Sequence, residues 1–155
     1  IYYFIKSLDD NNIGASQFYI HTSDHLHDMV QSISSITRNS YNHVNNNHKN
    51  LKFNQIRELK AVDKKMQVLF DQITSTFDSH SFEKIDEILA DKQQLLTHVS
   101  ELIQLQITRI RTSETSPKNT KLYFGILLET KDLIVSTMNL LQLFLEFYKD
   151  AKRTL

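Results

Sequence analysis

Apolar residues recur at alternating spacings of three and four along most of the chain, the pattern of helices that each bury one face. The longest such stretch covers residues 118–148, and we expect the other helices to pack around it. Its expected inward positions are Tyr123, Ile126, Leu127, Leu133, Ile134, Leu140, Leu141, Phe144, Phe147 and Tyr148. A buried face this wide requires several partner helices.

Three further stretches show helical periodicity, over about residues 14–45, 53–77 and 82–112. The first has an unusually polar face, with expected inward positions at Phe18, His25 or Leu26, Met29, Ile33, Ile36 and Val44. The second is predicted to bury Ile56, Leu59, Val62, Met66, Leu69, Phe70, Ile73 and Phe77. The third is predicted to bury Phe82, Ile85, Ile88, Leu89, Leu95, Leu96, Val99, Leu102, Ile103 and Ile110.

The connections between these helices are short and polar. An asparagine-rich run at residues 45–50 ends the first helix, because Asn tolerates left-handed backbone and competes for the helix hydrogen bonds. Residues 78–81 form a turn, and residues 112–117 form a linker whose proline, Pro117, suits the start of the last helix. Short connections make antiparallel neighbours, so we predict an elongated up-down four-helix bundle. Residues 1–8 are expected to add a short N-terminal helical segment.

Composition supports an all-α fold of one domain over residues 1–155. Two glycines and one proline in 155 residues favour long uninterrupted helices, and the absence of cysteine excludes thiolate metal sites and disulfides. Basic and acidic residues both number 18, which makes nucleic acid an improbable partner. Glu129, Lys131 and Asp132 interrupt the most apolar stretch, so we expect no membrane insertion. Because the sequence starts at Ile1 rather than Met, we expect it to be part of a longer protein.

One helix face carries a candidate site for a divalent or transition-metal cation. Histidines and aspartates three, four and seven residues apart share one side of a helix, and carboxylates one turn apart could join them from a facing helix. The candidate ligands are His21, Asp24, His25, Asp28, Glu129 and Asp132. The alternative is a polar layer without metal, in which His25 is satisfied by a hydrogen bond inside the bundle.

The residue pattern gives little support to the hypothesis that the chain is an enzyme. Ferritin-like di-iron sites need Glu-x-x-His on two helices, and no glutamate here has a histidine three residues later. The dipeptide His27-Asp28 is shared with HD phosphohydrolases, but those need an earlier histidine on a separate helix, and His21 lies in the same predicted helix. We therefore predict no catalytic residues and no enzyme activity.

When two stretches of the chain are aligned at an offset of 104 residues, three pairs are identical: Tyr19 and Tyr123, Asp28 and Asp132, and Ser32 and Ser136. Helices with a heptad pattern also produce such internal similarity by chance. The segment Asp24-His25-Leu26-His27-Asp28 has an acidic residue, three others, then aspartate. With SLDDNNIGASQFYIHTSDHLHDMVQSI and LLETKDLIVSTMNLLQLF, it resembles the PhoU-like family, of the kind fused C-terminally to bacterial inorganic phosphate transporters of the Na/Pi or PiT type. The likeness covers most of residues 7–148. In that family the carboxylate motif is repeated in the second half, and here Leu128 occupies its first acidic position while Asp132 occupies its last.

The resemblance implies a non-enzymatic regulatory domain on the cytoplasmic side of the inner membrane, tethered through an upstream transporter region. Its implied partners are the membrane part of the same chain and a second copy in a homodimer. In that family, isolated members bind metal clusters through the carboxylates. An alternative with the same bundle is a sensor or ligand-binding module of a signalling receptor.

Overall fold

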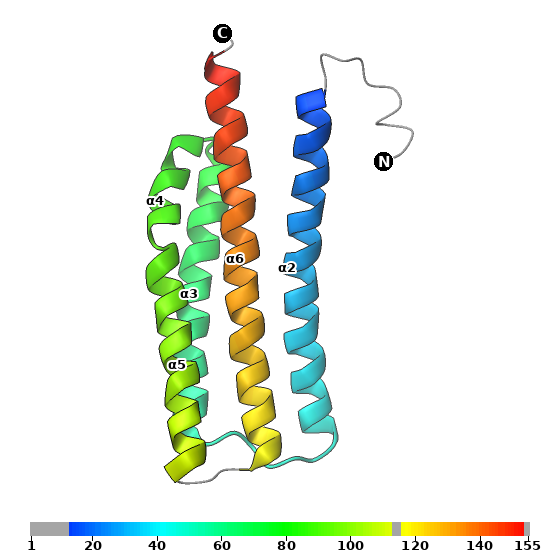
Figure 1. Ribbon diagram of the computed structural model, residues 1–155, viewed down its shortest axis with the longest axis vertical. Helices are drawn as coiled ribbons and strands as arrows, with labels where there is room; N and C mark the ends of the chain where they lie inside the picture. Colours follow the sequence, from blue (N-terminus) through cyan, green and yellow to red (C-terminus); the bar gives the residue numbers. More distant parts are fainter. Residues whose placement is uncertain (1–12, 113–115, 154–155) are drawn as a thin grey trace.

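The computed structural model describes residues 13–112 and 116–153, and this part of the chain is helical with no strand (Figure 1). The elements are α2 (Ile13–Asn45), α3 (Phe53–Asp78), the 3₁₀ turn η2 (Phe82–Lys84), α4 (Ile85–Ala90), α5 (Lys92–Thr112) and α6 (Pro117–Arg153). The all-α prediction is confirmed, as are the four helical segments. The short helix expected over residues 1–8 lies outside the described residues.

Long helices run up and down beside one another, with α3 and α5 on one side of α6 and α2 on the other (Figure 1). The buried apolar residues of the described chain come from α3, α4, α5 and α6, and α2 contributes none of them. They are Val62, Met66, Leu69, Ile85, Ile88, Val99, Leu102, Leu122, Tyr123, Leu127, Leu133, Ile134, Met138, Leu141 and Leu145. The core therefore lies between α3, the α4–α5 segment and α6, and α2 is an outer helix attached to α6.

Seven-residue spacings explain why these helices bury the faces they do. In α6, Leu127, Ile134 and Leu141 are seven apart and each is at most 1% exposed. In α3, the spacing joins Val62 and Leu69. A repeat of seven keeps one seam of a helix facing its neighbours over many turns, which is the geometry of aligned bundles.

The third predicted helix is interrupted, which corrects the expectation of one continuous helix over residues 82–112. It begins as η2, continues as α4 and passes through Asp91 into α5. The backbone N–H of Asp91 donates to the carbonyls of Ile88 and Leu89, so the turn there is tightened and the ladder bond to the fourth residue back is missing. Local 3₁₀ tightening of this kind offsets one helical segment from the next.

The predicted inward face of α2 is partly wrong. Val44 is 73% exposed, Ile33 is 49% exposed and Leu26 is 46% exposed, whereas Ser32 and His43 are buried. Because α2 packs mainly against one helix, only a narrow strip of its surface is covered. Small and polar side chains fill that strip, and the larger apolar residues lie beside it.

The chain turns of the bundle agree with the asparagine and proline signals. Asn47 has a φ of 52°, the left-handed conformation that ends α2, and His80 adopts the same φ after α3. Thr112 ends α5 and Pro117 opens α6. Within the described residues, no helix is long and apolar enough to cross a membrane.

Aromatic rings join four elements at the end of the bundle where α3 ends. Phe18 of α2 stacks on Phe147 of α6, with ring centroids 4.2 Å apart, and meets Phe144 edge to face at 5.0 Å. Phe144 also packs on Phe77 of α3 at 4.9 Å, and Phe82 lies 5.4 Å from Phe77. Edge-to-face ring pairs contribute stabilisation beyond that of the apolar area they bury, so this cluster holds the N-terminal half of α2 against the bundle.

Candidate functional site

The α2–α6 seam, the strip along which these two helices pack, is the most extensive helix contact in the described chain. Small side chains permit it: Ser16 and Ser32 of α2 are buried, and so is Thr137 of α6. The Thr137 hydroxyl donates to its own helix carbonyl at Leu133, at 2.7 Å, so it needs no partner across the seam. The seam thus contains buried polar side chains, and the Thr137 hydroxyl among them keeps a hydrogen-bond partner.

A depression of about 380 Å³ on one side of the seam brings carboxylates from both helices together. Asp28 from α2 lines it, as do Glu129 and Asp132 from α6. The Ser35 hydroxyl donates to Glu129 Oε1 at 2.8 Å and so links the helices directly. Half of the predicted metal ligands therefore share this surface, and their oxygen-only donor set suits a hard cation such as Mg²⁺ or Ca²⁺.

The other predicted ligands do not line the depression. His21 and Asp24 are exposed, and His25 is half-buried. Among the residues that the structure describes, no three or more His, Asp or Glu side chains converge closely enough to hold a metal ion. Cation binding therefore stays a prediction, and it would require the side chains of the depression to move toward one another.

The internal echo in the sequence has a spatial counterpart. Asp28 and Asp132 line the same depression, and so do Ser32 and Ser136, the residues that the offset of 104 pairs. The α2 and α6 helices run in opposite directions (Figure 1). Residues related by the offset of 104 can therefore lie close together only near one height along the seam. That level is where the two stretches of the family resemblance cross.

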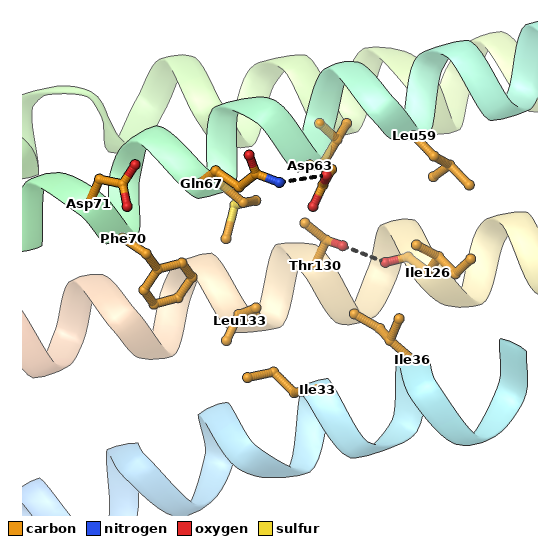
Figure 2. Close-up of a pocket in the computed structure, with 12 residues that line it drawn as sticks. Ile33, Ile36, Leu59, Asp63, Gln67, Phe70, Asp71, Ile126, Thr130 and Leu133 are labelled. Carbon is orange, nitrogen blue, oxygen red and sulfur yellow. Dashed lines mark hydrogen bonds between the residues drawn. The ribbon is translucent and has the colours of Figure 1, made fainter. Parts of the chain in front are cut away.

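A larger apolar groove, of about 680 Å³, lies on another side of α2, between α2, α3 and α6 (Figure 2). Its lining is mostly aliphatic and aromatic: Ile33, Ile36, Leu59, Val62, Asp63, Met66, Gln67, Phe70, Asp71, Ile126, Thr130 and Leu133. The charged members are Asp63 and Asp71, and Asp63 accepts a hydrogen bond from Gln67 at 2.9 Å. The groove is open because α2 rests on α6 without packing extensively on α3.

A charged network that was not predicted from the sequence connects α3, α5 and α6; its Glu58 and Arg109 side chains are partly exposed, and its Tyr123 is buried. Glu58 of α3 accepts hydrogen bonds from Arg109 of α5 at 2.5 and 2.9 Å and from the Tyr123 hydroxyl of α6 at 2.6 Å. The bonds from Arg109 are the main cause that lowers the pKa of Glu58. Burial, followed by the bond to Glu58, raises the pKa of Tyr123. These three residues lock the register of α3, α5 and α6.

Two buried glutamines extend the polar layer. Gln55 is 1% exposed and Gln106 is fully buried, and Gln55 Nε2 donates to Gln106 Oε1 at 3.4 Å. Gln106 in turn donates to Thr120 at 3.5 Å. The heptad spacing could have identified both, because Gln55 lies seven residues before Val62, and Gln106 lies four after the buried Leu102. An apolar-only search for core positions passes over them.

Comparison with known proteins yields no match: no family model, no curated protein and no solved structure matches this chain. The PhoU-like resemblance accordingly stays a prediction from the quoted residues. The described residues of the two quoted stretches lie on α2 and α6.

Proposed function

We propose that the chain is a non-enzymatic regulatory domain of an inorganic phosphate transporter, of the PhoU-like kind. It would be held at the cytoplasmic side of the inner membrane by a transporter region of the same polypeptide. The observation that supports this proposal best is the α2–α6 seam. The described residues of both stretches that resemble the family lie on these helices, and Asp28 and Asp132 line one depression between them.

Regulation would act through the attachment of α2. The helix is held mainly by α6, through a narrow strip of small side chains and the Ser35 to Glu129 hydrogen bond. Three carboxylates beside that bond repel one another, so a change in bound cation or in neighbouring charge alters the free energy of the closed seam. A domain with two seam states biases an attached transporter toward the state it binds better.

The direct test compares phosphate uptake by cells that make the complete polypeptide with uptake by cells in which residues 1–155 are deleted. Membrane abundance of the two proteins is measured by immunoblot so that rates refer to equal amounts. We expect uptake to continue with a changed dependence on external phosphate, by at least twofold in KM or maximal rate. The proposal fails if the complete polypeptide lacks a transporter region, or if the deletion leaves uptake unchanged.

A further inference from the structure

One side of α2 carries an exposed apolar stripe, which we call the α2 stripe. Its members are spaced by seven, four, three, eight and three residues, so they follow one line along the helix. Each is between 46% and 73% exposed: Tyr19, Leu26, Val30, Ile33, Tyr41 and Val44. A single exposed apolar residue is ordinary, but a continuous stripe along seven turns of one helix marks a contact surface.

Charge is unusually scarce on the same helix. Three of the 33 residues of α2 are charged, namely Asp24, Asp28 and Arg38, whereas eight of the 26 residues of α3 are. At 100° per residue, Asp24 and Asp28 point away from the α2 stripe, and Arg38 lies to one side of it, one turn before Tyr41. Depletion of charge around exposed apolar residues distinguishes the centre of a protein interface from ordinary surface. The outer helix of the bundle thus has the composition of a covered helix.

We infer that the α2 stripe binds the α2 stripe of a second copy of this chain, with the two helices antiparallel. A two-fold contact requires a surface that complements itself, because the same patch lies on both sides. Four of the six residues of the stripe meet this condition about a midpoint between Gln31 and Ser32. There Val30 lies opposite Ile33 of the partner, and Tyr19 lies opposite Val44 of the partner.

The area and charge of the stripe agree with a pair of identical chains. Six large side chains that are about half or more exposed form a patch on the order of 600 Å², the upper end for monomeric proteins. With its neutral polar neighbours, it approaches the roughly 800 Å² per chain that a stable interface buries. Arg38, the charged residue of α2 beside the stripe, lies opposite position 25 of the partner, so the two copies of Arg38 do not face each other in the pair. This inference does not depend on the phosphate-transporter proposal.

The first test measures the mass of the 155-residue chain by sedimentation equilibrium over a range of concentrations. We expect a reversible dimer with twice the monomer mass of 18.2 kDa. Val30→Glu should weaken it at least tenfold, because Val30 is 61% exposed in one chain and lies near the two-fold axis. Val68→Glu, at a residue of α3 that is 51% exposed and outside the stripe, is the matched control and should leave dimerisation unchanged. Circular dichroism verifies that both variants stay helical.

Disulfide trapping tests the direction of the pair, since the chain has no cysteine of its own. With a rise of 1.5 Å per residue, the two copies of Val30 lie about 4.5 Å apart along the axis and the two copies of Tyr41 about 28 Å apart. Val30→Cys should therefore form a covalent dimer under mild oxidation, and Tyr41→Cys should not. A monomer at every concentration, a dimer that Val30→Glu does not weaken, or trapping through Tyr41→Cys would overturn the inference.

Discussion

Removing the hydroxyl of Tyr123 should destabilise the protein by about 2 kcal/mol, although the change deletes one atom. The side chain is fully buried, and its hydroxyl donates to the Glu58 carboxylate at 2.6 Å. Hydrogen bonds to a charged group contribute about 1.5–3 kcal/mol. In Tyr123→Phe the ring keeps its packing, so the loss reports the hydrogen bond alone. For a chain of this size, about 2 kcal/mol corresponds to a melting temperature lower by about 4–8 °C.

Urea denaturation followed by circular dichroism measures the free energy of unfolding, and Tyr41→Phe serves as the control. Tyr41 is 66% exposed, so loss of its hydroxyl should change stability by less than about 0.5 kcal/mol. A double-mutant cycle with Glu58→Gln isolates the coupling of the two side chains, which we expect to exceed about 1 kcal/mol. A loss below about 0.5 kcal/mol for Tyr123→Phe, or additive effects in the cycle, would refute the claim that the network stabilises the core.

The difference in the free energy of unfolding between the parent and Tyr123→Phe should also depend on pH. Hydrogen bonds from Arg109 and Tyr123 lower the pKa of Glu58. Its contribution to stability is therefore present above the unfolded pKa of about 4.3 and is lost as pH falls through the lower folded value. Tyr123 has a raised pKa, so its contribution is present below pH about 10 and is lost above it. The stability gap between the parent and Tyr123→Phe should narrow in acid and in strong alkali, and a gap independent of pH would contradict this account.

Substitutions at three further positions test packing and turn geometry, each by urea denaturation. Leu127→Ala, at a fully buried position of α6, should cost about 2–5 kcal/mol, and a cost below about 1 kcal/mol would contradict its place in the core. Ser32→Leu should overpack the α2–α6 seam and cost about 1–3 kcal/mol, with added protease cleavage within α2. Asn47→Gly should be neutral or slightly stabilising, and Asn47→Ala should cost about 1 kcal/mol because φ is 52°. Equal stability of the two Asn47 variants would argue against that turn.

The helices could be predicted from the sequence to within a few residues, because seven-residue periodicity and the turn residues are local signals. Asn47 and Pro117 mark two of these boundaries as expected. The tightened turn at Asp91 was missed, since its backbone geometry depends on how α4 and α5 pack. The buried Gln55 and Gln106 were missed because a pattern of apolar residues alone passes over polar residues at core positions, although the heptad spacing includes both.

Which surface of α2 is covered could not be predicted, for a physical reason. The periodicity places Ile33 and Val44 on an apolar face of the helix. The same periodicity arises whether that face packs on another helix of this chain or on another molecule. The structure separates the two cases, because both residues remain exposed while Ser32 is buried. The sequence also could not show which candidate metal ligands lie together. Asp28, Glu129 and Asp132 line one depression, and the candidate histidines do not.

The most direct test of the seam as a regulatory element is phosphate uptake by the complete polypeptide carrying Asp28→Asn and Asp132→Asn. This pair of changes removes two charges from the depression on the seam and keeps the side-chain shapes. The control carries Asp63→Asn and Asp71→Asn, which remove two charges from the apolar groove instead. We predict that the seam variant changes the phosphate dependence of uptake at least twofold while the control matches the parent. Identical uptake by all three proteins at equal membrane abundance would contradict a regulatory role for the α2–α6 seam.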